Sequence, residues 1–315
     1  MKAAVIGVGN MGKNHVRVYS EIAQLVAVAD LDEKKGKELA ERFNCRYYRD
    51  YREMLQKEEI DVVSIAVPSI FNRVIAFDVI HAGKPFLLEK PIADTLQNAR
   101  AIIEEAERCN VRFMVGHIER FNPAVLKMKE IVNRKELGEV TSLVAKRVGV
   151  MPANFRSSNV VIDLAVHDID IFNYLLDDIP LKVTGNSGTA LVNSDYADLL
   201  LRYGKTNAFI QVNWITPIKI RQLCVTGSEG YAELDYITQE INIYRSNFKR
   251  DYDTFGDFVI QFNPTKETIA LKKQEPLKVE LQTFLDCVSE KRSFPVTGGQ
   301  AYQALKTALE CLQGQ

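Results

Sequence analysis

A lysine two residues after the end of an apolar run is the first candidate for chemistry in this sequence. Lys90 comes after Phe86–Leu88 and before Pro91, so it stands at the end of a predicted buried strand. A lysine at such a strand end can reach a bound ligand, and desolvation or nearby positive charge lowers its pKa toward neutral pH. A lysine taken by itself is more often a solvated surface residue. The rest of the chain must decide between these two interpretations.

An aspartate and a histidine four residues apart form the second candidate. Asp163 and His167 fall within a predicted helix over 160–176, on one helical face. The carboxylate could orient the imidazole or stabilise its cation, as proton transfer requires. The alternative is an exposed acidic face that carries a charge-paired histidine. Asp170 would also allow a metal site, but no further His or Cys cluster accompanies it, so we expect no metal.

A glycine-rich segment near the N-terminus is the element that would position a ligand. It has the pattern GxGxxG over residues 7–12, and it joins a predicted strand over 2–6 to a predicted helix that runs to about residue 22. Gly7 permits the tight turn, and Gly9 lets the backbone approach a pyrophosphate at the helix N-terminus. Gly12 lets the helix pack closely on the strand. In this context the pattern indicates a dinucleotide-binding loop, with Asn10 and Met11 completing it.

An acidic residue closes the next apolar strand, 18 residues after the last glycine of the loop. Asp30 is placed to accept hydrogen bonds from the ribose hydroxyls of an adenosine. A 2′-phosphate would bring negative charge beside Asp30 and Asp32, and Leu31 offers no compensating cation. The sequence therefore favours NAD as the cofactor over NADP.

Strands and helices alternate through the first third of the chain. We predict strands over 25–30, 61–67, 86–88 and 111–115, and helices over 33–43, 51–57, 73–82 and 94–109. Such alternation indicates a parallel, doubly wound sheet, whose ligands lie at the carboxyl ends of the strands. The predicted cofactor-binding residues are Gly7, Gly9, Asn10, Met11, Gly12, Asp30, Pro68, Glu89, Lys90 and His117.

The second part of the chain has a different pattern. A predicted helix over 124–134, a strand over 140–148 and the helix over 160–176 precede six strands of alternating character between 181 and 245. Two helices, over 277–291 and 299–312, end the chain, whereas 246–276 could not be placed. We expect residues 1–118 to form an NAD-binding domain of the Rossmann type. Residues 119–315 should form an α+β domain with a large, open, mostly antiparallel sheet, although the last helix could pack on the first domain. One sheet face, left uncovered by helices, would join a homodimer or homotetramer.

The bulk composition excludes several classes of protein. The chain has 315 residues, 46% of them hydrophobic, and a net charge of −1, so nothing global attracts nucleic acid or a membrane surface. No apolar run is long enough to span a bilayer, and the first residues lack the pattern of a signal peptide. Five scattered cysteines without a CxxC pair fit reduced thiols. We therefore expect a cytoplasmic protein.

The motifs occur together in an order that resembles the glucose–fructose oxidoreductase/inositol dehydrogenase (GFO/IDH/MocA) family. They are GxGxxG over 7–12, Asp30, Glu89-Lys90-Pro91 and the Asp163-x3-His167 pair. The resemblance implies that Lys90, Asp163 and His167 are the catalytic residues. It also implies a cis bond between Lys90 and Pro91. Asn72 departs from the family, many members of which have histidine there, and we expect this to matter little for the chemistry. Residues 157–161 lack the glycines that often precede the catalytic aspartate.

Three segments, over 116–123, 162–170 and 213–217, are similar to the nucleotide-sugar branch of this family. That branch includes UDP-N-acetylglucosamine 3-dehydrogenases, so the resemblance implies NAD-dependent oxidation at C3 of a UDP-linked N-acetylhexosamine. Alternatives are a dehydrogenase of UDP-N-acetylglucosaminuronate, one of a free sugar or inositol, and a catalytically silent NAD-binding sensor. The expected substrate-binding residues are Lys90, Arg120, Asn122, Arg147, Arg156, Asp163 and His167.

Overall fold

A computed structural model describes residues 1–151, 159–191, 194–245 and 265–313. The chain forms two compact units. Unit 1 contains residues 1–121 and 275–305, and unit 2 contains residues 122–274 and 306–315. The segment over 275–305 thus groups with the N-terminal residues, and helix α10 (Gly298–Gln313) is divided between the two units.

Unit 1 is built on a six-stranded sheet in the order β3-β2-β1-β4-β5-β6. All of its neighbouring strands are parallel, which confirms the predicted doubly wound sheet. The strands are β1 (Lys2–Ile6), β2 (Gln24–Ala29), β3 (Arg46–Tyr48), β4 (Val62–Ile65), β5 (Phe86–Glu89) and β6 (Phe113–Gly116). The edge strand β3 was not predicted, since three residues carry too little periodicity to be recognised.

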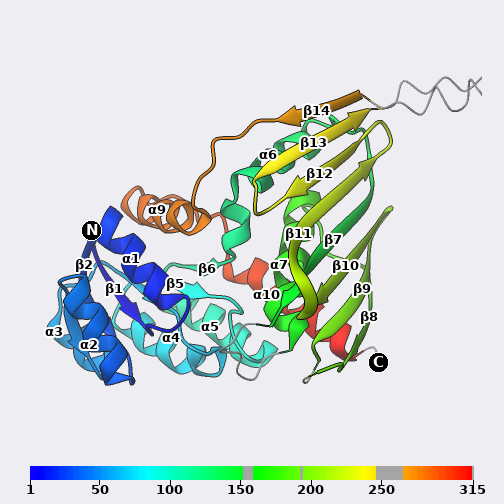
Figure 1. Cartoon of the computed structure of the whole chain (residues 1–315). Helices are drawn as coiled ribbons and strands as arrows, with labels where there is room; N and C mark the ends of the chain where they lie inside the picture. The colour runs from blue at the N-terminus through cyan, green and yellow to red at the C-terminus, as the bar shows by residue number, and fades with distance from the viewer. Residues whose placement is uncertain (152–158, 192–193, 246–264, 314–315) are drawn as a thin grey trace, which may run out of the picture. The chain divides into compact units, whose positions relative to one another are not determined.

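The helices of unit 1 follow the strands in the predicted alternation. They are α1 (Gly12–Ile22), α2 (Glu33–Arg42), α3 (Tyr51–Lys57), α4 (Asn72–His81), α5 (Leu96–Arg108) and α9 (Pro276–Ser289), with short 3-10 turns η1 (Ser69–Phe71) and η2 (Ile118–Phe121). Thr95 caps α5 by accepting a hydrogen bond from the Asn98 N–H. Helix α9 packs against α1 and η2, although it lies far from both in the sequence. Figure 1 shows α9 beside α1.

Unit 2 contains an eight-stranded sheet in the order β14-β13-β12-β11-β7-β10-β9-β8. Its neighbours are antiparallel except β7 and β10, which are parallel, so the predicted mostly antiparallel sheet is confirmed. The strands are β7 (Val140–Val150), β8 (Lys182–Gly188), β9 (Tyr196–Tyr203), β10 (Thr206–Asn213), β11 (Ile215–Gly227), β12 (Tyr231–Asp235), β13 (Glu240–Arg245) and β14 (Thr265–Ile269). The edge strand β14 was not predicted.

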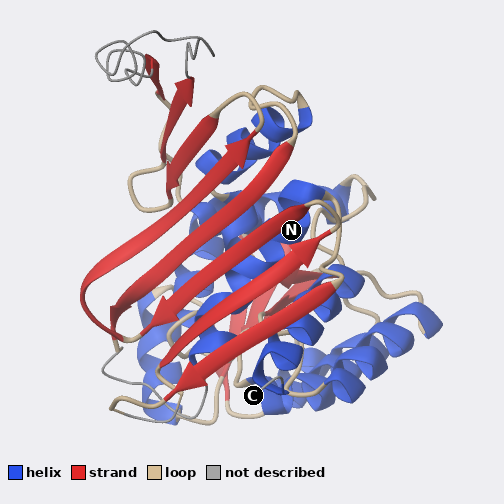
Figure 2. Ribbon diagram, turned by 90° about the vertical axis from the view of Figure 1, so that its right-hand side faces the viewer, coloured by secondary structure: helices blue, strands red, loops and turns tan. Residues whose placement is uncertain are grey.

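The two faces of this sheet differ. Helix α6 (Pro123–Asn133), the π-helical turn η3 (Val161–Ala165) and α7 (Val166–Leu176) pack together, and α6 and η3 contact the sheet. Figure 2 shows the other face of the sheet turned toward the viewer. Side chains alternate strictly between buried and exposed along β9, as expected for a sheet covered on one face. No helix among the described residues is long and apolar enough to cross a membrane.

Candidate active site

The glycine-rich loop between β1 and α1 has the geometry of a phosphate cradle. Gly7 has a φ of 88°, and a side chain there would come within 2.5 Å of the Ala66 carbonyl oxygen. A Cβ at Gly12 would lie 1.8 Å from the Gly7 carbonyl oxygen, so the helix start requires glycine. Gly9 differs, because a Cβ there would meet no protein atom within 4 Å. The open space beside Gly9, at the N-terminus of α1, fits a dinucleotide pyrophosphate.

The predicted ribose-binding carboxylate is held in place by the backbone. One oxygen of Asp30 accepts a hydrogen bond from the Val8 N–H at 2.7 Å, and the other accepts one from the Asp32 N–H at 2.8 Å. A carboxylate retains further lone pairs for ribose hydroxyls. Leu31 beside it is 78% exposed. Lys35, a cation close to Asp30 in the sequence, pairs with Asp32 at 2.6 Å.

Lys90 stands at the same sheet edge as the glycine-rich loop. β1 and β5 are parallel and separated by β4 alone, so their carboxyl ends, Ile6 and Glu89, open on one side of the sheet. Lys90 is half-buried, and its bond to Pro91 is cis, as the family resemblance implied. His117, which is almost fully buried, follows β6 at this edge.

A polar side chain that the sequence analysis set aside holds the segment after Lys90. Asn72, the first residue of α4, is buried and donates from Nδ2 to the carbonyl oxygens of Pro91 at 3.0 Å and Ile92 at 3.3 Å. The expectation that Asn72 matters little therefore overlooked its contact with this turn. The sequence offered little indication of this contact, because an asparagine at a helix start is ordinarily interpreted as a helix cap.

In unit 2, the predicted aspartate and histidine lie at an irregular helix start. Asp163 belongs to the π-helical turn η3, and His167 belongs to the first turn of α7. Both side chains are half-buried, whereas neighbours such as Val166 and Asp168 are buried. Single π turns inside helices occur frequently at functional sites. A π-helical turn is wider than an α-helical turn, so it changes which side chains share a helix face. At this helix start, Asp163 and His167 remain partly accessible.

The structure gives Arg147 a different role from the predicted one. Its guanidinium is almost fully buried and donates to both carboxylate oxygens of Asp168, from Nε at 2.8 Å and from Nη2 at 2.9 Å. It also lies over the ring of Tyr236, 4.8 Å from the centroid. A bidentate, buried pair neutralises the cation within unit 2. We therefore treat Arg147 as structural, not as a diphosphate ligand. Arg156, the other predicted diphosphate ligand, lies outside the described residues.

Two further predicted cleft residues have local structural partners. Arg120 is buried in η2 and donates from Nη1 to the carbonyl oxygen of Pro295 at 3.3 Å. Asn122 is buried and caps α6, because its Oδ1 accepts a hydrogen bond from the Ala124 N–H at 3.1 Å. Its Nδ2 donates to the Tyr236 carbonyl oxygen at 3.0 Å. Capping and tethering account for Asn122 without a substrate.

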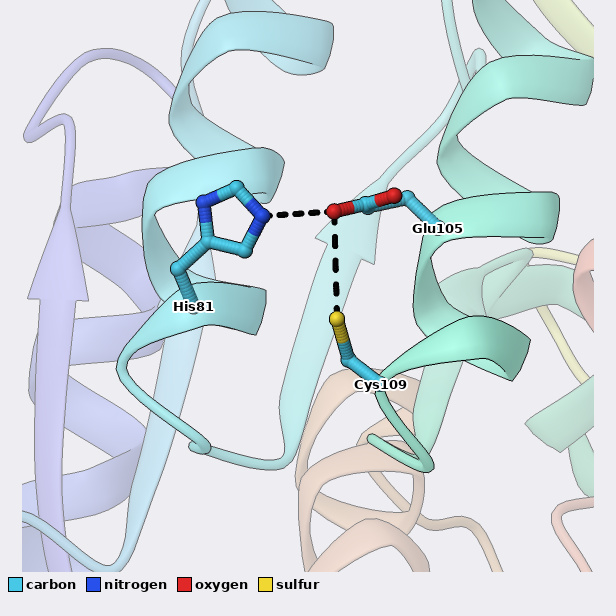
Figure 3. A group of neighbouring side chains, drawn as sticks. All are labelled: His81, Glu105 and Cys109. Atoms are coloured by element: carbon cyan, nitrogen blue, oxygen red, sulfur yellow. Dashed lines mark hydrogen bonds and ion pairs between the residues drawn. The ribbon is translucent and has the colours of Figure 1, made fainter.

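Another group of possible metal-ligand atoms lies at the C-terminal ends of α4 and α5, away from the sheet edge that carries Lys90. Ligand atoms of His81, Glu105 and Cys109 lie within 4.8 Å of one another (Figure 3). However, Arg108 donates to both oxygens of Glu105, at 2.9 and 2.6 Å, and His81 Nε2 lies 2.5 Å from one of them. Arg108 first, and His81 second, lower the pKa of the Glu105 carboxyl to about 2. This group is a surface ion-pair cluster that ties α4 to α5.

Comparison with known proteins gives a consistent result over most of the chain. Residues 1–117 match a family described as "Oxidoreductase family, NAD-binding Rossmann fold", and residues 125–233 match the GFO/IDH/MocA C-terminal domain. The UDP-N-acetylglucosamine 3-dehydrogenase of Acidithiobacillus ferrooxidans is 26% identical over 98% of this chain and 96% of its own length. Its solved structure superposes with a TM-score of 0.88 at 25% identity, covering 100% of this chain and 97% of that chain.

Other relatives share the fold but carry different names. An inositol 2-dehydrogenase of Acidothermus cellulolyticus is 29% identical over 64% of this chain and 61% of its own length. A levoglucosan dehydrogenase solved with NADH and levoglucosan has a TM-score of 0.87 at 20% identity, covering 100% of this chain and 96% of that chain. The second likeness supports the fold alone. Together the comparisons agree on the kind of reaction and differ on the sugar.

Proposed function

This chain belongs to the GFO/IDH/MocA family of oxidoreductases, and we propose that it uses NAD to oxidise the C3 hydroxyl of a UDP-linked N-acetylhexosamine to a ketone. The observation that carries the proposal is the position of Lys90 at the sheet edge that also carries the glycine-rich loop. The full-length likeness to a UDP-N-acetylglucosamine 3-dehydrogenase supports the choice of substrate. The family assignment disfavours the silent-sensor alternative.

The proposed roles follow from the chemistry of the reaction. When bound, the nicotinamide accepts a hydride from the carbinol carbon. His167 takes the hydroxyl proton, and Asp163 orients its imidazole. Lys90 donates a hydrogen bond to the same oxygen and stabilises the negative charge that develops there. If this assignment is right, the double variant Lys90→Ala/His167→Ala loses hydride transfer but still binds NAD.

NAD is proposed over NADP because Asp30 is fixed beside an uncharged, exposed Leu31. A 2′-phosphate placed there would face the carboxylate and would gain no arginine partner among residues 30–32. The test is a comparison of kcat/KM for the two cofactors. A higher value with NADP would overturn this part of the proposal.

A second candidate is a dehydrogenase of a free polyol, which the inositol dehydrogenase relatives favour. Recognition of a diphosphate separates the two, and Arg156 is the remaining predicted ligand. The variant Arg156→Ala should raise KM for the UDP-sugar without changing turnover of a free sugar. Arg202→Ala, at an exposed position on β9, is the matched control. If wild type and Arg156→Ala had equal KM values for the UDP-sugar, the free-sugar candidate would be favoured.

The uncovered face of the unit 2 sheet supports a proposal about assembly. Leu200, Phe209 and Val144 are paired across β9, β10 and β7 and are 54%, 37% and 39% exposed. Their side chains form an apolar row on the face opposite the helices. We propose that this row lies in a homodimer or homotetramer interface, as the open sheet suggested.

A further inference from the structure

Glu89, the residue before Lys90, is the centre of a buried polar network in unit 1. It is only 6% exposed, and its Oε1 lies 2.9 Å from Nε2 of His15, while Oε2 accepts a hydrogen bond from the Lys90 backbone N–H at 3.1 Å. Gly116 on β6 leaves room for this carboxylate, since a Cβ there would lie 3.2 Å from the carboxyl carbon. Glu89 therefore fixes the backbone of the residue that follows it.

The hydrogen bonds behind Glu89 can run in a single direction. His15 Nδ1 lies 3.2 Å from the Ser64 hydroxyl oxygen, which lies 2.9 Å from the Tyr19 hydroxyl oxygen. Tyr19 can donate to Ser64, Ser64 to Nδ1 of a neutral His15, and Nε2–H of His15 to Glu89. All three side chains are fully buried. In this arrangement every donor of the hydrogen-bond series is satisfied when Glu89 accepts at both of its carboxyl oxygens, as a carboxylate does.

A second buried acid lies on α9, the helix that packs against α1 and η2, and it receives none of these donors. Glu280 on α9 has no exposed surface, and neither carboxyl oxygen has a hydrogen-bond partner among the described residues. A buried carboxylate without donors is far more costly than the neutral acid. Burial first, and the charge of Glu89 second, raise the pKa of the Glu280 carboxyl well above its ordinary value.

The elements packed against α9 carry several ionisable groups. Helix α1 carries His15 and Tyr19, and η2 carries Glu119 and the buried Arg120. Among the acids, Glu89 is the one whose charge raises the pKa of Glu280. The interaction with Glu280 contributes to raising the pKa of Tyr19, after burial. Of two carboxyl groups buried in the same region, the one that receives hydrogen-bond donors is the more stable anion. By this criterion the proton lies on Glu280 and the charge on Glu89.

We propose that Glu280 is a positioning residue that carries the proton of a buried carboxyl pair, so that Glu89 stays an anion and fixes His15 and the Lys90 backbone. This inference rests on the proposed function, because it bears on catalysis through Lys90. If Glu280 lost its proton, two adjacent negative charges would compete for the donors of Glu89. The hydrogen bond to the Lys90 N–H would weaken, and turnover would fall on the alkaline side.

The experiment combines a pH profile with a readout that needs no substrate. In wild type, kcat should decline at alkaline pH as Glu280 ionises, whereas Glu280→Gln cannot ionise. The ratio of kcat for Glu280→Gln to kcat for wild type should therefore rise by up to about tenfold per pH unit above that point. A ratio that is the same at every pH would mean a purely structural role and would overturn the proposal.

The second readout is the infrared difference spectrum of wild type minus Glu280→Gln at pH 7, recorded with NAD alone. It should contain the carbonyl stretch of a protonated carboxylic acid. Glu38→Gln, at an exposed site on α2, is the control and should not show it. A carboxylate band assigned to Glu280 would overturn the inference. Because this measurement needs no sugar, a failed substrate assignment would leave its result unaffected.

Discussion

Replacing Glu280 by glutamine should stabilise the protein, and the gain should grow with pH. In the unfolded chain the carboxyl group titrates near 4.5, whereas in the folded protein burial and the Glu89 charge raise its pKa well above that value. Between the two pKa values, folding requires the uptake of one proton. The contribution of this group to the free energy of unfolding is therefore fully present below pH 4.5 and falls as the pH rises toward the folded-state pKa.

The magnitude follows from the linkage of one proton. Each pH unit in that window lowers the stability of wild type by about 1.4 kcal/mol relative to a side chain that does not titrate. From pH 4.5 to pH 7 the accumulated difference reaches up to about 3 kcal/mol, if the folded-state pKa lies above 7. Glutamine keeps the shape of the neutral acid, so its own effect should be constant with pH.

Urea unfolding followed by circular dichroism at pH 5, 6, 7 and 8 measures this difference. The free energy of unfolding of Glu280→Gln minus that of wild type should increase at each step. The same difference for Glu38→Gln should stay constant with pH. A variant that becomes less stable than wild type as the pH rises would refute the reasoning, because it would mean that Glu280 is a partnered carboxylate in the folded protein.

Four further substitutions test other parts of the account. Gly9→Ala should fold normally, because its Cβ meets no protein atom, but it should bind NAD at least about tenfold more weakly in titration calorimetry. Gly12→Ala should lower the melting temperature in scanning calorimetry, because its Cβ meets the Gly7 carbonyl oxygen. Asn72→Ala should lower kcat by about tenfold in steady-state assays with little change in NAD affinity, because two bonds to the turn after Lys90 are lost; an unchanged kcat would make those bonds irrelevant to catalysis. Phe209→Glu should reduce the mass measured by light scattering to that of a smaller species, whereas Gln56→Glu, at an exposed site on α3, should not.

Local patterns predicted most of the fold. Apolar runs and glycine signals located β1 and α3 with their observed bounds, and the alternation of strands and helices indicated the parallel sheet correctly. The parallel pairing of β7 with β10 was not predicted, since it joins residues 65 positions apart, such as Ser142 and Asn207, and no local signal encodes it. For the same reason the grouping of residues 275–305 with unit 1 depends on the packing of α9 against α1.

The candidate site shows a similar division. Motif spacing located the glycine-rich loop, and the family resemblance implied the cis bond after Lys90. It missed the partner of Arg147, because Asp168 is recognisable as a buried ion-pair partner only once β7 and α7 are packed. Glu280 did leave a signal, since it falls within the apolar stripe of α9 formed by Leu277, Leu281 and Phe284. An acid at such a position is almost never fully buried without a reason.

The central claim is tested most directly by mixing the protein with NAD and UDP-N-acetylglucosamine and following NADH absorbance. The account predicts NADH formation by wild type, and none by Lys90→Ala/His167→Ala under conditions where that variant still binds NAD. It would be contradicted if no UDP-sugar reduced NAD while a free polyol did, or if the double variant turned over as fast as wild type.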